Sequence, residues 1–170
     1  EVARRFHQFF GEVFPEPQPL LAAVPRLPGL DNRKMSKSYG NTIDLSDDAP
    51  TVRKKVMRMY TDPKRVRADI PGTVEGNPVF IYHDAFNPDS DQVADFKARY
   101  RAGTVGDVEV KEALVTAINA RLEPMRERRA SLISRPDRIR EILHEGSAKA
   151  RTVAKETMAQ VREAVGLAYR

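Results

Sequence analysis

Residues 29–41 bring together the side chains of this sequence that could do chemistry. Two lysines, Lys34 and Lys37, stand three residues apart in this run, with the small hydroxyl residues Ser36 and Ser38 beside them. Ammonium groups at this spacing suit the oxygens spread along a polyphosphate, because each lysine carries a compact charge on a long flexible stem. Glycines near both ends let the backbone bend close to an anion and open again when product leaves. The run, which we call the lysine loop, predicts a mobile phosphate clamp, with an ordinary solvated loop as the alternative.

The segment before the lysine loop indicates the end of an α/β domain. Apolar side chains over residues 1–14 follow helical spacing, and the prolines at positions 15, 17 and 19 are expected to end that helix. The apolar run Leu20–Val24 predicts a short buried strand, and a loop follows it as far as Ile43. A helix, a strand and a loop in this order are typical of the tail of an α/β sheet domain. We therefore expect residues 1–45 to form such a tail.

After residue 46 the hydrophobic period becomes helical and stays so, which predicts an all-helical domain over residues 46–170 and a chain that is mainly α. The core is expected to include Phe96 and Tyr100, Pro124 is expected to kink a helix, and Gly146 to end one. The apolar residues before that glycine are expected to face inward: Ile139, Ile142 and Leu143. The expected helix starts are Pro50, Ser90, Ser134 and Ser147, with a short apolar stretch from Pro78 to Phe86 and a helical apolar stripe from Val110 to Met125.

Composition excludes several classes of protein. The 170 residues contain no cysteine, which excludes disulfides, thiolate metal sites and iron–sulfur clusters. The histidines, His7, His83 and His144, are too scattered to predict a metal site, and we expect His83 and His144 at the surface or half-buried. The longest apolar run, Leu20–Val24, is far shorter than the roughly 20 residues of a membrane span. No cleavable apolar leader follows Glu1, so we expect a cytoplasmic location and an internal piece of a longer protein.

The positive charge is concentrated toward the C-terminus. The net charge is +5, and residues 121–170 supply it with 12 lysines and arginines against 7 acidic residues. A local excess of arginine points toward a polyanion such as nucleic acid, and a solvated helical face is the alternative. The candidate contacts are Arg126, Arg128, Arg129, Arg135, Arg138 and Arg140, with a second basic group at Lys54, Lys55, Arg65 and Arg67.

The lysine loop resembles the signature loop of the class I aminoacyl-tRNA synthetases. Residues 34–38 read Lys-Met-Ser-Lys-Ser, a fitting Gly29-x-Asp31 precedes them, and a fitting Asn41 follows. Downstream segments narrow the resemblance to the C-terminal half of the bacterial tryptophanyl-tRNA synthetases, over essentially the whole chain. These segments are Met59–Pro63, Asp69-x-Pro71-Gly72, Gly76–Phe80, Leu122–Arg128 and Val161–Leu167.

The resemblance implies a reaction in which tryptophan attacks the α-phosphate of ATP, and the activated acyl group then moves to tRNA(Trp). Lys37, and after it Lys34, would be the catalytic residues, because ammonium groups aimed at the leaving pyrophosphate stabilise the transition state. The backbone at Met35, and at Arg26 and Leu27, would lie near the adenine, and Mg²⁺ would be held chiefly by the nucleotide. The ATP-binding residues implied are Leu27, Lys34, Met35, Ser36, Lys37 and Ser38.

The resemblance also implies how the rest of the chain is used. Residues 1–45 would end a Rossmann-like nucleotide-binding domain, and residues 46–170 would form the anticodon-binding domain, with tRNA contacts at Arg126, Arg129 and Arg135. The family's His-x-Gly-His signature and tryptophan pocket are absent from these residues, so the 170-residue piece alone is expected to be inactive. The full-length protein is expected to be a homodimer. The alternatives are a tyrosyl-tRNA synthetase and a non-catalytic paralogue that acts as an RNA- or protein-binding regulator.

Overall fold

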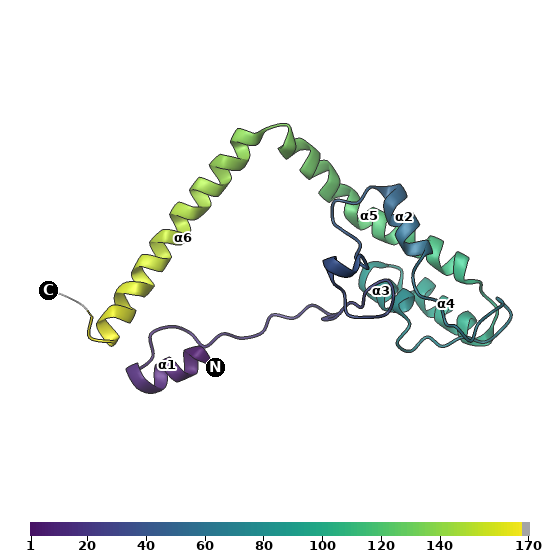
Figure 1. Cartoon of the computed structure of the whole chain (residues 1–170), viewed down its shortest axis with the longest axis horizontal. Coiled ribbons are helices and arrows are strands. Elements are labelled where there is room, and N and C mark those ends of the chain that lie inside the picture. Colours follow the sequence, from purple (N-terminus) through teal and green to yellow (C-terminus); the bar gives the residue numbers. More distant parts are fainter. Residues whose placement is uncertain (168–170) are drawn as a thin grey trace. The chain divides into compact units, whose positions relative to one another are not determined.

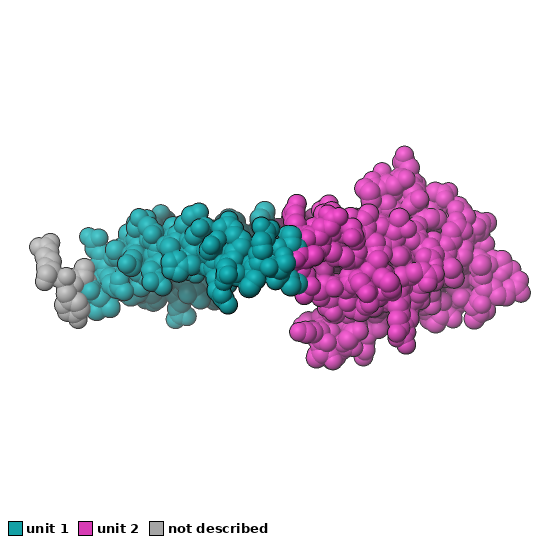
Figure 2. Space-filling view, turned by 90° about the horizontal axis from the view of Figure 1, so that it is seen from above, with its two compact units in different colours: residues 1–20, 131–170 teal, residues 21–130 magenta. Residues whose placement is uncertain are grey.

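The structure, a computed structural model, describes residues 1–167, and among them it contains six α-helices, one short 3-10 helix and no strand. The expected fold class, mainly α, is confirmed. The chain divides into two units, residues 21–130 and residues 1–20 with 131–170, which Figure 2 colours separately. The boundary expected between residues 45 and 46 falls inside the larger unit, and as a division of function it stays a prediction.

The strand expected at residues 20–24 is wrong. Leu20 is fully exposed and Leu21 is 71% exposed, so this run contributes nothing to a core. A strand needs a neighbouring chain to pair its backbone N–H and C=O groups, and none lies beside it in the described part of the chain. The first helix, α1 (Val2–Phe10), is also shorter than expected, because Gly11 leaves the helical conformation with a φ of 83°.

Four helices form the unit of residues 21–130 (Figure 1): α2 (Ala49–Met57), α3 (Pro78–Phe86), α4 (Ser90–Ala102) and most of α5 (Asp107–Ile133). Three of them begin at a side chain that accepts a hydrogen bond from the first turn. Asp48 accepts from the Thr51 N–H, Asn77 from that of Val79, and Asp89 from that of Gln92. Such caps satisfy backbone donors that a helix start leaves unpaired. Asp89, rather than the expected Ser90, therefore caps α4.

The core of this unit is built on aromatic side chains of α3 and α4. Phe96 and Tyr100 are buried, as expected, and the Tyr100 ring meets the Phe80 ring edge-on at a centroid distance of 4.9 Å. His83, expected near the surface, is fully buried instead. Its Nε2 lies 2.9 Å from the Val110 carbonyl oxygen, and burial lowers its pKa. The imidazole is therefore a neutral core residue with a hydrogen-bond partner.

The segment between α2 and α3 is folded around the buried guanidinium of Arg65. This group donates hydrogen bonds to the carbonyls of Ile70, Ala68 and Val105, pairs with the Asp107 carboxylate at 3.0 Å, and lies over the Tyr100 ring. Its side chain is completely inaccessible, so the expectation that it belongs to an exposed basic group is wrong. The guanidinium instead satisfies the polar backbone of a loop that has no regular structure.

Gly72 explains why this segment packs so closely. A Cβ atom at Gly72 would lie 2.3 Å from the Tyr100 ring, so only glycine fits there. Gly103, in the left-handed region with a φ of 70°, closes α4, and a Cβ there would lie 2.6 Å from the Asp69 carbonyl oxygen. The Asp69-x-Pro71-Gly72 sequence is therefore a packing motif against the end of α4.

The two last helices are longer than expected. α5 runs through Pro124 to Ile133, and α6 (Pro136–Ala164) runs through Gly146. The stop expected at Gly146 and the new start expected at Ser147 are wrong, because one glycine costs only about 1 kcal/mol inside a helix. The apolar residues before it do not face inward within residues 1–167: Ile139, Ile142 and Leu143 are 38%, 46% and 64% exposed. Within the same residues, none of the helices combines the length and apolar character of a membrane span.

Candidate functional site

The side chain of Asn41 holds the lysine loop together from inside. It is only 4% exposed, and its Oδ1 accepts the Ser36 backbone N–H at 2.9 Å. Its Nδ2 donates to the Asp31 carboxylate at 2.8 Å and to the Lys34 carbonyl at 3.1 Å. One buried amide therefore fixes the backbone on both sides of the segment that carries the lysines.

Gly29 and the backbone of Asn41 close the loop. The Leu30 N–H donates to the Asn41 carbonyl at 2.9 Å, and the Gly29 N–H donates to the Arg33 carbonyl at 2.7 Å. A Cβ atom at Gly29 would lie 2.1 Å from the Asn41 Nδ2. The spacing of Gly29, Asp31 and Asn41 that the sequence singled out therefore describes one hydrogen-bonded unit.

Asp31 is the anionic member of this unit. Besides the Asn41 amide, it accepts hydrogen bonds from the Arg33 Nε at 2.7 Å and from the Arg33 N–H at 3.1 Å. The Asn41 hydrogen bond, and after it those of Arg33, lower the pKa of Asp31 to about 2. Asp31 therefore stays ionised at every pH at which the protein would work, and it accepts hydrogen bonds without donating any.

Lys34 and Lys37 point their charges to solvent. Both side chains are exposed, and neither ammonium group makes an ion pair or hydrogen bond within residues 1–167. A 3-10 helix, Lys37–Tyr39, carries the second lysine, and the Ser36 and Ser38 hydroxyls lie 2.8 Å apart beside it. The loop thus presents two uncommitted cations and two hydroxyls, which is the arrangement that a phosphate clamp needs.

The N-terminal end of the lysine loop is fastened to the helices. The Tyr82 hydroxyl of α3 donates to the Pro28 carbonyl at 2.8 Å, and the Tyr60 N–H donates to the Leu30 carbonyl at 2.7 Å. Burial raises the pKa of Tyr82 to about 12, so its hydroxyl remains a donor at neutral pH. Tyr82 is joined to a residue 54 positions away, which periodicity alone cannot reveal.

The chain leaving the lysine loop is fastened as well. Lys55 on α2 pairs with the carboxylates of Asp47 at 2.5 Å and Asp44 at 3.4 Å. Arg126 on α5 donates from Nε to the Asp47 carbonyl at 2.8 Å. Both ends of the loop are therefore anchored on the same helical unit.

The three arginines expected to contact tRNA lie in different environments. The Arg126 side chain is only 15% exposed, and besides Asp47 its guanidinium binds Asn119 at 2.7 Å and Glu123 at 2.8 Å. Arg129 is exposed, and Arg135 is exposed with its Nε donating to the Ser131 carbonyl at 3.2 Å. Their contact with RNA stays a prediction, and the structure gives Arg126 a second role within the chain.

A small apolar cavity of about 180 Å³ lies between the lysine loop and the helices. The side chains of two residues expected to bind ATP, Leu27 and Met35, line it together with Ile43 and with residues of α3 and α5. These two side chains thus face apolar surroundings, and the contact of their backbone with the adenine stays a prediction.

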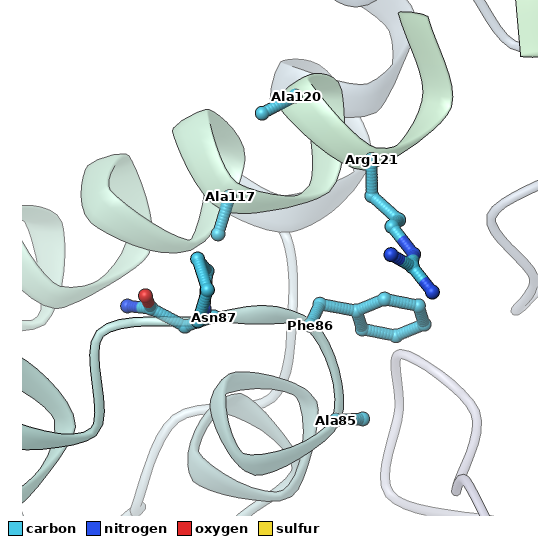
Figure 3. Close-up of a pocket in the computed structure, with 7 residues that line it drawn as sticks. Ala85, Phe86, Asn87, Ala117, Ala120 and Arg121 are labelled. Atoms are coloured by element: carbon cyan, nitrogen blue, oxygen red, sulfur yellow. The ribbon is translucent and has the colours of Figure 1, made fainter. Parts of the chain in front are cut away.

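A larger hollow of about 400 Å³ lies at the end of α3, and none of the predicted site residues lines it. Ala117, Ala120 and Arg121 of α5 line one side, and Phe86 and Asn87 line the other (Figure 3). The Arg121 guanidinium lies beside the Phe86 ring in this view. The hollow has no nucleophile or acid–base pair, so it offers no alternative catalytic centre.

Protein-derived metal ligands are not gathered at the lysine loop. Within residues 1–167, no three histidine or carboxylate side chains lie close enough together to hold a metal ion. The carboxylates of Asp44 and Asp47 are used by Lys55, and that of Asp31 by Arg33 and Asn41.

Comparison with known proteins identifies the class. The family model described as tRNA synthetases class I (W and Y) matches residues 1–123. The chain therefore belongs to the class I tRNA synthetases that serve tryptophan and tyrosine. This assignment agrees with the resemblance of the lysine loop to the signature loop of the class I synthetases.

Curated relatives point to the tryptophan branch of the family. The chain is 60% identical to the tryptophan–tRNA ligase of Treponema pallidum over 171 residues, covering 100% of this chain and 51% of that protein. It is 47% identical to that of Aquifex aeolicus, covering 98% of this chain and 42% of that protein. The chain thus spans about half the length of the curated relatives it matches. The resemblance to one half of a tryptophanyl-tRNA synthetase is confirmed.

A solved structure shows the same fold. Campylobacter jejuni tryptophanyl-tRNA synthetase complexed with ADP and tryptophan superposes with a TM-score of 0.71 at 30% identity, covering 98% of this chain and 51% of that one. The sequence motifs therefore identified the family, and the fold supports that assignment. The anchoring contacts of Tyr82 and Arg126 were not predicted, because they join residues 54 and 79 positions apart in the chain.

Proposed function

We propose that this chain belongs to an enzyme that joins tryptophan to tRNA(Trp) with ATP, and that it supplies the lysine loop for the first step. The observation that carries the proposal is the pair of exposed, unpaired ammonium groups of Lys34 and Lys37 on a loop held by the buried Asn41 amide. The family membership and the tryptophan-specific relatives support the choice of amino acid.

In the first step a carboxylate oxygen of tryptophan attacks the α-phosphorus of ATP. The bond from that phosphorus to the bridging oxygen of the β-phosphate breaks, and pyrophosphate leaves with the bonding electrons. Negative charge grows on the leaving group during this step. Lys37, assisted by Lys34, therefore stabilises the transition state more than it stabilises bound ATP. Mg²⁺, carried mainly by ATP, would supply further positive charge for this neutralisation.

The remaining loop residues position the nucleotide. The Ser36 and Ser38 hydroxyls would donate hydrogen bonds to phosphate oxygens, once their mutual contact at 2.8 Å opens. The backbone at Leu27 and Met35 would lie against the adenine while their side chains remain in the apolar cavity. Because other groups bind the adenine and the phosphates, the two lysine side chains can neutralise the charge that develops on pyrophosphate.

The helical part would bind tRNA in the second step. Exposed arginines of the C-terminal region, among them Arg129 and Arg135, would contact phosphates, while Arg126 has its guanidinium engaged by Asp47, Asn119 and Glu123. The full-length enzyme would work in the cytoplasm as a homodimer.

Amino-acid-dependent pyrophosphate exchange by the full-length protein tests the proposal. Tryptophan should support exchange of labelled pyrophosphate into ATP, and tyrosine should not. Residues 1–170 alone should show none. Exchange with tyrosine would make the protein a tyrosyl-tRNA synthetase, and no exchange with any amino acid would favour a non-catalytic RNA- or protein-binding regulator.

A further inference from the structure

Lys111 of α5 is a buried ammonium group that the proposed catalysis does not use. The residue is only 5% exposed, and no carboxylate pairs with it within residues 1–167. Its Nζ donates instead to two backbone carbonyls, that of Met57 at 3.2 Å and that of Met59 at 2.7 Å. Burial lowers the pKa of Lys111, and the Asp107 carboxylate opposes this shift. The core therefore holds a cation at a place where an apolar side chain of similar length would avoid the cost of burying a charge.

Helix capping accounts for one of the two hydrogen bonds of Lys111. Helix α2 ends at Met57, and the last carbonyls of a helix have no partner within it. A cation at this end is also favoured by the helix dipole. Met59, however, lies beyond the end of α2, and the hydrogen bond to its carbonyl is the shorter of the two. This second bond therefore needs another explanation.

A single peptide unit joins Lys111 to the lysine loop. The Met59 carbonyl and the Tyr60 N–H belong to the same trans peptide unit, so they point in opposite directions. The carbonyl accepts the hydrogen bond from Lys111, and the N–H donates to the Leu30 carbonyl at 2.7 Å. The Leu30 N–H in turn donates to the Asn41 carbonyl at 2.9 Å, which closes the loop. A row of hydrogen bonds thus leads from Lys111 to the base of the lysine loop.

The row fixes the orientation of this peptide unit. The unit is planar and rigid, so a partner on each side prevents its rotation. An ammonium group is a stronger donor than a neutral N–H, and hydrogen bonds in a row polarise one another. Lys111 therefore strengthens the bond from Tyr60 to the Leu30 carbonyl. Leu30 is only 8% exposed, so water cannot readily replace this bond if the peptide unit turns away.

We propose that Lys111 is a positioning residue for the activation of tryptophan, and that it acts on the lysine loop through the Met59–Tyr60 peptide unit. The inference rests on the proposed function, because the placement of the loop matters for catalysis only if its lysines act on phosphate. Lys111 touches no substrate in this role. It holds the base of the loop, so that Lys34 and Lys37 start from a fixed support.

Lys111→Met in the full-length protein tests this role, because methionine is nearly as long as lysine and has no donor. The rate of tryptophan-dependent pyrophosphate exchange per active site should fall about tenfold or more, since small displacements of catalytic groups cost this much. The KM for tryptophan should change less than about twofold, because the loop acts on the phosphates. Active sites are counted from the burst of adenylate formation, so that unfolded protein does not enter the rate.

Val93→Ala separates positioning from a general loss of stability. Val93 is a buried residue of α4, 5% exposed, and its truncation should lower the unfolding temperature. Pyrophosphate exchange per active site should nevertheless stay within about twofold of the wild type, because Val93 has no part in the row of hydrogen bonds. The two variants are compared at the same interval below their unfolding temperatures. Equal losses per active site in both would overturn the inference.

Amide hydrogen exchange at Tyr60 follows the row of hydrogen bonds without reference to activity. In Lys111→Met this amide should exchange about tenfold faster or more, because a hydrogen bond to a charged group is lost beside it. In Val93→Ala it should exchange close to the wild-type rate. An unaltered rate in Lys111→Met would overturn the inference.

The wild type supplies the test if Lys111→Met does not fold. Saturating adenosine 5′-(β,γ-methylene)triphosphate, added without tryptophan, should slow hydrogen exchange at the Tyr60 amide. Coupling between two sites is reciprocal, so a nucleotide bound by the loop must also stabilise the peptide unit that supports the loop. An unaltered rate with the nucleotide bound would overturn the inference.

Failure of the proposed function gives a different result. A wild type without tryptophan-dependent pyrophosphate exchange would remove the enzyme and, with it, the step that Lys111 serves. A wild type that exchanges pyrophosphate, together with a folded Lys111→Met variant that does so at the same rate per active site, would retain the enzyme and remove the positioning role.

Discussion

Arg126 on α5 donates a hydrogen bond from Nε to the backbone carbonyl of Asp47, at 2.8 Å, and so ties the helical unit to the chain leaving the lysine loop. Asn119 and Glu123 hold the other guanidinium nitrogens and fix the direction of this bond. An arginine that sequence patterning places on an RNA-binding surface is thus also a positioning residue for the loop that carries Lys34 and Lys37.

Replacing Arg126 should therefore affect the first reaction step. Arg126→Ala should lower the tRNA-independent exchange rate about 10- to 100-fold, because small misplacements of catalytic groups cost this much. Arg129→Ala, an exposed neighbour on the same helix, is the control and should leave exchange unaltered. Unaltered exchange with weakened tRNA binding in Arg126→Ala would return this residue to a purely RNA-contacting role.

Replacing Lys37 tests the phosphate clamp directly. Lys37→Ala should reduce the rate of tryptophan activation about 10²- to 10³-fold while tryptophan binding stays nearly unchanged, because the ammonium group acts on charge that develops only in the transition state. Pre-steady-state formation of the adenylate would report the rate, and equilibrium dialysis the binding. A loss smaller than about threefold would contradict the clamp.

The pairing of Asn41 with Asp31 allows a rescue experiment. Asn41→Asp places two carboxylates together and removes the donor to Lys34, so exchange should fall about tenfold or more. Adding Asp31→Asn restores a donor–acceptor pair and should recover part of the loss. If the double variant is as slow as the product of the single effects predicts, the two side chains do not act as a unit.

Gly72 should be far less tolerant of a methyl group than Gly106. Gly72→Ala should destabilise the fold by about 1–3 kcal/mol, because the new methyl group collides with the Tyr100 ring. Gly106→Ala is the comparison, since the nearest atom to its Cβ would be the Ala68 methyl at 3.9 Å. Urea unfolding measures both. Equal stability of the two variants would show that the ring moves aside freely.

Burial of His83 predicts an acid-sensitive fold. Burial lowers the pKa of His83 below its ordinary value of 6.5, and of its neighbours Asp84 opposes this shift while Lys97 adds to it. The unfolded chain therefore takes up this proton at a higher pH than the folded chain. The corresponding stability is fully present above pH 6.5 and is lost as pH falls from there toward the folded-state pKa.

Thermal unfolding between pH 7.5 and pH 5 measures this loss. The wild type should lose stability over this range, and His83→Gln, which cannot take up the proton, should show a flatter pH profile. His144→Gln is the control at an exposed position and should keep the wild-type profile. Identical profiles for all three proteins would show that His83 takes up its proton equally in both states.

Local signals were sufficient for the helical fold and for the lysine loop. The starts of α2 and α4, the closing Gly103 and the buried Tyr100 all follow from capping residues and helical spacing within a few positions. The loop was recognisable because its residues are close in sequence.

Local sequence signals gave wrong predictions where contacts with distant residues determine the structure. Leu20–Val24 has strand-like composition but no partner strand within the described residues, and Gly146 lies in a helix long enough to absorb its cost. The burial of Arg65 and His83 depends on carbonyls 40 and 27 positions away, at Val105 and Val110, which no local pattern encodes.

The contact of Gly29 with Asn41 has a consequence for how this protein can vary. Because the Leu30 N–H donates to the Asn41 carbonyl, the backbone between these two residues, which contains eleven peptide bonds, forms a closed ring of fixed length. Inserting or deleting one residue inside the ring would shift Lys34 and Lys37 relative to the Asn41 side-chain amide that fixes the loop backbone. Length changes among natural homologues should therefore fall outside residues 30–41, and a transplanted loop should be cut at those two positions.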